Sequence, residues 1–169
     1  FMAISNGSNV TASSNSSDGY KTALQVTGNA TANITNDSYT NPVDSASPAF
    51  NVFLDHGNAT IANTTIEAKA KGNVVANNGS NLTLSNDTLA NTKYKGQYGF
   101  VTNSAGNVTI DSCHFAGNSG LYAMVLKGGN FTITNNKASS YHIFLVNKGN
   151  NTINESNNDA AGMRYSVNA

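Results

Sequence analysis

Carboxylates are the first residues to consider for chemistry, because glycoside hydrolysis uses two of them facing each other across the bond that breaks. The chain has nine Asp and Glu residues. Only Asp87 and Asp111 come near a shared position in the repeat described below, and we expect these two side chains to face the same way. The single arginine, Arg164, lies far along the chain and cannot support that pair. We therefore predict no catalytic residue, and we rank a polysaccharide-acting enzyme low.

The cysteine and histidine side chains do not suggest a catalytic site either. Cys113 is the only cysteine, which excludes an internal disulfide, and Asp111 and His114 lie beside it. The repeat predicts that Cys113 is a small core residue and not a nucleophile. The adjacent Asp55 and His56 fall in a predicted turn. No spacing typical of a metal site occurs in the sequence, and we predict neither a metal nor a cofactor.

Aromatic side chains can bind sugars by stacking, usually with Trp among them, and this chain has no Trp. Five tyrosines recur at similar places in the repeat: Tyr20, Tyr98, Tyr122, Tyr141 and Tyr165. Such a ladder forms either an exposed platform or an internal aromatic stack. The regular spacing favours the internal stack.

A five-residue motif organises the chain that must position these groups. It reads Gly or Ser, Asn, any residue, Thr and an apolar residue, and its seven copies are 8–12, 28–32, 57–61, 80–84, 106–110, 129–133 and 149–153. The steps between the Thr residues are 20 to 29 residues, which is the length of one coil of a β-solenoid. We predict an all-β parallel β-helix of about seven coils. Residues 1–169 would form one solenoid domain, either complete or as a segment of a longer repeat array.

The alternation of strand side chains predicts which residues face outward. The outward ladder would comprise Asn58, Thr60, Asn81, Thr83, Asn107, Thr109, Asn130 and Thr132. The inward positions would include Ile61, Leu84, Ile110 and Ile133, with Val52, Val75, Val101 and Met124 from a second ladder. The longest coil contains two prolines, so we expect residues 39–48 to form a protruding loop.

Each Asn-x-Thr copy is also an acceptor sequence for N-glycosylation, and further copies lie outside the motif. We single out Asn63, Asn86, Asn107 and Asn130 as candidate acceptors. Adjacent coils of a solenoid stack at about 4.8 Å. Glycans on every coil would therefore crowd one another, and we expect partial occupancy.

The composition excludes several classes of protein. The 29 Asn, 18 Ser, 17 Thr and 15 Gly residues make up nearly half of the chain, and only 11% of it is charged. A formal net charge of zero gives no electrostatic footprint for nucleic acid. No apolar run approaches the roughly 20 residues of a membrane span. We therefore expect neither nucleic-acid binding nor a membrane span.

The repeated units, such as residues 129–135, resemble the coils of right-handed parallel β-helix surface proteins. That group includes autotransporter passenger domains, secreted filamentous adhesins and the adhesin-like proteins of methanogenic archaea. The resemblance covers nearly the whole chain, and it implies a right-handed helix and a secreted, cell-surface location. Coil motifs of this kind indicate the fold far better than the function.

We expect a non-enzymatic extracellular protein with a structural or adhesive role. The alternative is a self-assembling subunit of an extracellular sheath, filament or surface layer, because apolar residues such as Ile4 and Ile153 would lie at open coil ends. The partners would be neighbouring solenoid subunits or the rest of a longer chain, with host surfaces or glycans as further candidates. A flat Asn/Thr array also resembles ice-binding solenoids, and we rank that function low.

Overall fold

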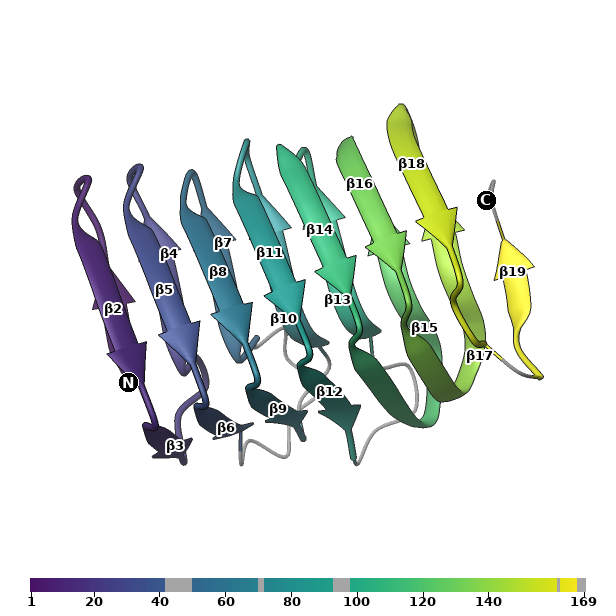
Figure 1. The fold of residues 1–169 in the computed structure, drawn as a ribbon, viewed down its shortest axis with the longest axis horizontal. Helices are drawn as coiled ribbons and strands as arrows, with labels where there is room; N and C mark the ends of the chain where they lie inside the picture. Colours follow the sequence, from purple (N-terminus) through teal and green to yellow (C-terminus); the bar gives the residue numbers. More distant parts are fainter. Residues whose placement is uncertain (42–49, 70–71, 93–97, 161, 167–169) are drawn as a thin grey trace.

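The computed structural model describes residues 1–41, 50–69, 72–92, 98–160 and 162–166. These residues form strands and turns, and no helix occurs among them. Every strand pairing in this part of the chain is parallel and joins one coil to the next. The result is a parallel β-solenoid of about six turns, which advances from β2 to β19 in Figure 1.

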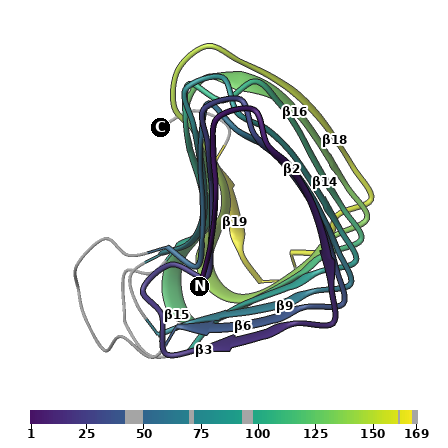
Figure 2. The same cartoon turned by 90° about the vertical axis from the view of Figure 1, so that its left-hand side faces the viewer.

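Three walls surround the core, as the view along the axis in Figure 2 shows. The front wall is a seven-stranded sheet of β2 (Asn9–Ser13), β5 (Thr31–Thr35), β8 (Asn58–Ala62), β11 (Asn81–Ser85), β14 (Asn107–Asp111), β16 (Gly129–Thr134) and β18 (Asn151–Ser156). The lower wall contains β3 (Ser16–Asp18), β6 (Ser38–Asn41), β9 (Thr65–Ala68) and β12 (Thr88–Asn91). The rear wall contains β1 (Met2–Ile4), β4 (Leu24–Thr27), β7 (Val52–Asp55), β10 (Gly72–Asn77) and β13 (Tyr98–Asn103).

Two long strands join the lower and rear walls into one sheet. These strands are β15 (His114–Leu126) and β17 (Lys137–Asn147), and each continues through the corner where the earlier coils break. The short β19 (Arg164–Ser166) pairs with β17. The walls therefore share one continuous core.

The front wall alternates as the motif predicts. Ile61, Leu84, Ile110 and Ile133 are fully buried and stack in register from coil to coil. Ile110 and Ile133 are direct neighbours, as a parallel solenoid requires. The Asn and Thr residues between the apolar positions point away from the core. The inside and outside faces of this wall were therefore predictable from the sequence.

The rear wall differs from the prediction at two positions. Val52 and Met124 point inward and are fully buried, as expected, but Val75 and Val101 pair with each other in an outward row. The residues that stack on Val52 are Val74 and then Phe100. The shift arises in the turn that joins the rear wall to the front wall. Two residues lie between Asp55 and Asn58, whereas three lie between the corresponding Asn77 and Asn81, so counting back from the front-wall Thr reaches the wrong face.

The predicted loop over residues 39–48 begins too early. Tyr39 lies in β6, where its ring is fully buried and its hydroxyl donates to Asp37 Oδ2 over 2.7 Å. Burial raises the pKa of Tyr39, and the neighbouring Asp37 raises it further. Residues 42–49 lie outside the described part of the chain.

The corner between the front and lower walls is built by local chemistry. One residue in each coil has a positive φ there, including Asn36, Asn63, Asn86 and Ser112 at 52° to 57°. Asn visits this left-handed region at low cost because its short side chain bonds locally. The next residue in each coil turns inward and forms a ladder that we call the corner row: Asn15, Asp37, Thr64, Asp87, Cys113, Asn136 and Asn158.

Side chains of the corner row bind the backbone of the preceding coil. The Thr64 amide donates to Asp87 Oδ1 over 2.8 Å, and the Cys113 amide donates to Asn136 Oδ1 over 2.8 Å. The Asp37 amide likewise donates to Thr64 Oγ1 over 3.2 Å. These bonds satisfy backbone donors that a tight corner removes from the strand ladder. The five-residue motif does not predict this row.

Candidate functional site

The outer face of the front wall carries the most regular array of side chains. Two rows run along the solenoid axis, an Asn row (Asn58, Asn81, Asn107 and Asn130) and a Thr row (Thr60, Thr83, Thr109 and Thr132), and each is in register over four coils. All eight residues are partly or fully exposed. We call them the central array. The eight residues of the predicted outward ladder therefore lie in two rows on the outer face of the front wall.

The central array ends on both sides where the two residue types exchange places. Thr31 lies in register with Asn58, and Asn33 lies in register with Thr60. At the other end Thr152 lies beside Asn130, and Asn154 beside Thr132. The motif copies 28–32 and 149–153 had predicted Thr31 and Thr152 in the Thr row, and both predictions were wrong by two residues.

Because strand side chains alternate with a period of two, a register shift of two residues leaves the same side chains on the outer face. The prediction of which residues face outward is therefore correct although the register is not. In the observed register, Thr11, Asn33, Thr60, Thr83, Thr109, Thr132 and Asn154 occupy the same position in successive coils. The steps between them are 22 to 27 residues long. The coils are thus more uniform than the predicted range of 20 to 29.

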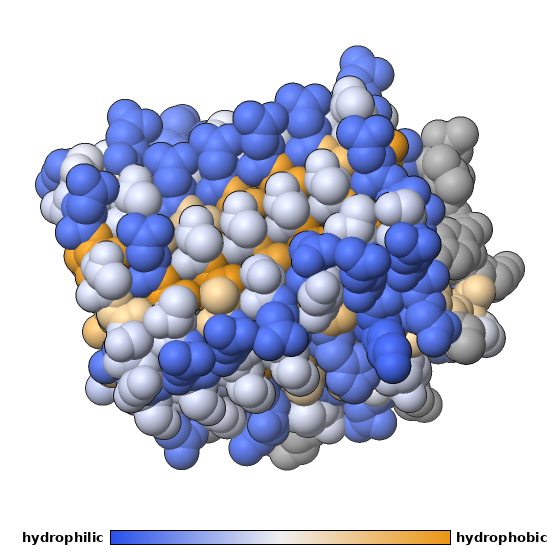
Figure 3. Space-filling model, viewed as in Figure 1, coloured by the Kyte–Doolittle hydropathy of each residue, from blue (hydrophilic) through white to orange (hydrophobic). Residues whose placement is uncertain are grey.

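A shallow groove runs between the Asn row and the Thr row, from Thr31 to Thr109. Its floor includes Ala59 and Leu82, which are otherwise core residues. Figure 3 shows this arrangement, with apolar surface visible between the polar rows. None of the residues that line the groove carries a charge. The groove offers hydroxyls, amides and a narrow apolar strip.

The two rows differ in how far their polar groups are already bonded. Asn81 Nδ2 donates to Asn58 Oδ1 over 2.8 Å, and Asn130 Nδ2 donates to Asn107 Oδ1 over 3.2 Å. The Asn107 amide donates to Asn81 Oδ1 over 2.8 Å, which connects the row in its middle. The hydroxyls of the Thr row have no hydrogen-bond partner within the described residues. The Asn row is therefore held in place, and the Thr row is available to a ligand.

The four candidate glycosylation acceptors are all exposed. Asn86 Nδ2 donates to Asn63 Oδ1 over 2.7 Å at the front corner. Asn107 and Asn130 form the pair described above in the Asn row. The candidates thus fall into two hydrogen-bonded pairs on adjacent coils, and we still expect partial occupancy within each pair.

Asp87 and Asp111 do not face the same way, contrary to the prediction. Asp87 is 1% exposed and points into the corner row, whereas Asp111 is half-buried on the outer face. Asp111 accepts bonds from Thr134, Asn135 and Ser112, which lower its pKa. The positive-φ residue that precedes each corner-row position turns the chain, so the strand alternation does not continue through it. The two carboxylates cannot act together on one sugar.

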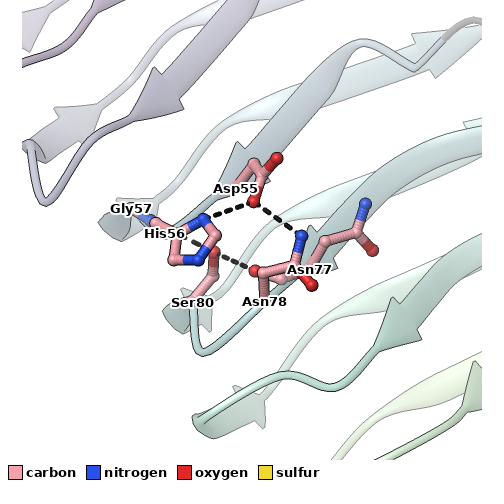
Figure 4. A network of polar contacts seen from close by, with 6 residues as sticks. All are labelled: Asp55, His56, Gly57, Asn77, Asn78 and Ser80. Carbon is pink, nitrogen blue, oxygen red and sulfur yellow. Dashed lines mark hydrogen bonds and ion pairs between the residues drawn. The ribbon is translucent and has the colours of Figure 1, made fainter.

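The Asp55, His56 and Ser80 side chains have the composition of a catalytic triad, and Figure 4 shows why their arrangement differs. His56 Nδ1 lies 2.7 Å from Asp55 Oδ1, which also accepts a bond from Asn78 Nδ2. The buried Ser80 hydroxyl donates to the Asn77 carbonyl over 2.6 Å and accepts from the Gly57 amide. These bonds stabilise the turns of two adjacent coils. His56 lies in a turn, as predicted, whereas Asp55 is the last residue of β7.

Cys113 is a core residue, as the repeat predicts. It is 2% exposed, and its thiol donates to the Asp111 carbonyl over 3.4 Å. Burial raises the pKa of the Cys113 thiol to about 12. Such a thiol is not ionised near neutral pH, so it is a poor nucleophile.

The tyrosines do not form a single platform. Tyr98 and Tyr122 stack on each other with ring centroids 5.6 Å apart and an interplanar angle of 13°. Tyr141 is buried, and its hydroxyl donates to Asn91 Oδ1. Tyr20 is exposed beside Phe1. Tyr98 and Tyr122 are both only partly buried, so their stack is not internal, and the predicted internal stack is wrong for this pair and for Tyr20.

The described residues contain no cluster of three or more His, Cys, Asp or Glu side chains arranged to hold a metal ion. They also contain no helix with the length and apolar character needed to cross a membrane.

Comparison with known proteins agrees with the architecture. Residues 2–160 match the family model described as the right handed beta helix region. No curated protein and no solved structure matches the chain. The match covers nearly the whole sequence and supplies the handedness of the solenoid. The chain belongs to the right-handed β-helix family.

Proposed function

We propose that this chain is a non-enzymatic extracellular surface protein that acts as a structural or adhesive β-solenoid. The observation that carries the proposal is the central array, which presents four coils of identical, uncharged polar groups beside a groove. A rigid wall of repeated weak contacts suits a surface that holds on to another surface. The resemblance to surface adhesins points the same way.

The arrangement of the ionisable groups supports the non-enzymatic part of the proposal. Glycoside hydrolysis needs two carboxyl groups that face one substrate. Asp87 is enclosed in the corner row, and Asp111 is bonded to three neighbours on the other side of the corner. Asp55, at the end of β7, is bonded to His56 and to Asn78. None of these groups adjoins the groove.

The direct test measures adhesion and turnover on the same material. Beads coated with the full chain are incubated with a panel of cell surfaces and extracellular polysaccharides, and the released reducing sugar is measured. Beads coated with a chain unfolded by Ile110→Asp are the control. We expect folded-chain beads to adhere without any release of sugar. Release of sugar, or equal adhesion by the unfolded control, would contradict the proposal.

Self-assembly into a sheath, filament or surface layer is the second candidate. The edge strand β2 favours it, since Val10 and Ala12 of its inner face are only partly buried. The opposite edge strand β18 opposes it, because Glu155 takes the inward position that Ile133 holds one coil earlier. An inward-pointing charge on an edge strand discourages further pairing.

Glu155 also provides the experiment that separates the two candidates. Light scattering on the wild-type chain and on Glu155→Leu measures end-to-end association over a range of concentrations. If self-assembly is the function, the wild-type chain forms particles larger than a monomer. If the adhesive role is correct and Glu155 protects the edge, the wild-type chain stays monomeric and Glu155→Leu associates.

A further inference from the structure

We propose that the groove of the front wall binds a neutral, linear, β-linked oligosaccharide that lies along the solenoid axis. This inference rests on the proposed adhesive function and names the ligand of that face. The groove crosses β5, β8, β11 and β14 at right angles to the strands, so an extended chain fits it lengthwise. A flat crystalline surface such as ice would instead meet the tops of both rows.

The chemistry of the lining defines the class of ligand. Thr60, Thr83 and Thr109 present hydroxyls without protein partners, and each can donate one bond and accept others. The Asn amides opposite them are aligned by their own ladder. Because no charge lines the groove, an acidic or sulfated glycan has no counterion there. A neutral ligand rich in hydroxyl groups matches this set of donors and acceptors.

The floor of the groove explains how the less polar part of a sugar would be accommodated. Ala59 and Leu82 form an apolar strip between the two polar rows. The C–H groups of a β-linked pyranose ring can lie on such a strip while its hydroxyls reach the Thr and Asn side chains. Binding sites for small molecules commonly combine an apolar base with a few placed polar groups.

The exchange of residue types at the ends of the central array limits the length of the ligand. The groove and the central array share the coils of β8, β11 and β14, which span two steps of about 4.8 Å, or roughly 10 Å. One pyranose unit has a length close to one step, so a chain of about three units spans these coils. Beyond the array, Asn33 and Asn154 replace the Thr hydroxyls. Affinity should therefore rise with chain length and then level off.

The experiment titrates the folded chain with cellobiose, cellotetraose and cellohexaose and follows backbone amide shifts by NMR. Tetragalacturonate is the charged control ligand. Thr83→Val removes one groove hydroxyl while it keeps a similar shape, and Thr11→Val is the matched control because Thr11 lies outside the central array. We expect cellotetraose to shift the amides of β8, β11 and β14 and to bind far better than cellobiose. Thr83→Val should weaken binding roughly threefold to tenfold, and Thr11→Val should leave it unchanged.

Several results would overturn the inference. Binding that is equal for the two variants would exclude the groove, and preferential binding of tetragalacturonate would exclude a neutral ligand. Inhibition of ice recrystallisation without any binding of oligosaccharide would assign the face to ice. If the coated beads adhere to cell surfaces and no neutral oligosaccharide binds or competes, the ligand is wrong and the adhesive function remains.

Discussion

At the scale of single residues, Asp87 has the most unusual environment among the described carboxylates. It is buried in the corner row, where its two oxygens accept bonds from the amides of Thr64 and Ser85 at 2.8 and 3.0 Å. Burial raises the pKa of Asp87 to about 7, even though these two bonds act in the opposite direction. The folded chain therefore holds a proton on Asp87 more tightly than the unfolded chain, in which Asp titrates near pH 4.

This difference predicts how the stability of the fold depends on pH. The contribution of Asp87 is fully present below about pH 4, is lost as the pH rises towards 7, and is constant above that. Asp87→Asn keeps a neutral acceptor, and Asn136 and Asn158 show that Asn fits this row. Thermal unfolding between pH 4 and pH 8 should reveal a loss of a few kcal/mol in the wild-type chain that is absent in the variant. Parallel pH profiles for the two chains would contradict the assignment.

The inner and outer positions of the front wall predict two opposite results. Ile110→Asp places an unpaired charge in the dry column between Leu84 and Ile133, and should cost about 4 kcal/mol or more. Thr109→Ser on the outer face should cost well under 1 kcal/mol. Denaturant unfolding of both variants measures the difference. Similar unfolding midpoints would mean that the two faces are assigned incorrectly.

At the scale of the elements, the sequence predicted the strands of the front wall better than their register. Asn and Thr both suit an outward position, so nothing in the residues 28–32 shows that Thr31 pairs with Asn58 instead of Thr60. A register shift of two residues also leaves the inward apolar residues facing the core. Only the length of chain spent at each corner fixes the register, and a local motif does not report it.

The rear wall shows the opposite case. There the turn before the front wall has three residues between Asn77 and Asn81 but two between Asp55 and Asn58, and this difference of one residue reversed the predicted facing of Val75. The apolar pattern does not show whether Val74 or Val75 faces the core, because Val74, Val75 and Ala76 are all apolar and all buried. The corner row was missed for a related reason, since a buried Asp or Asn in a polar sequence resembles any other turn residue.

The corner between the front and lower walls gives a prediction for Asn86, which lies between β11 and β12. Asn86 has φ of 55° and donates to Asn63 across the coils. Asn86→Val should destabilise the fold by about 1 to 2 kcal/mol, because a β-branched residue is strained in the left-handed region. Asn86→Gly relieves that strain and should cost less. Thermal unfolding compares the two, and a more stable Val variant would contradict the role given to this corner.

At the scale of the whole molecule, the fold is a stack in which each coil buries the one before it. The repeat and its composition were enough to predict that architecture, because apolar positions recur once or twice per strand in every coil. The candidate site was predictable only in part. The outward Asn and Thr residues follow from the motif, but the ends of the central array and the course of the groove depend on the observed register.

The measurement that tests the account most directly maps adhesion onto the walls of the solenoid. Thr83→Lys introduces a long charged side chain in the groove of the front wall, and Thr65→Lys introduces the same change on the exposed face of β9 in the lower wall. Both variants should unfold at nearly the wild-type temperature, since both sites are on the surface. We predict that beads coated with Thr83→Lys lose adhesion and that beads coated with Thr65→Lys keep it. Retained adhesion with Thr83→Lys, or its loss with Thr65→Lys alone, would contradict the assignment of the front wall as the functional surface.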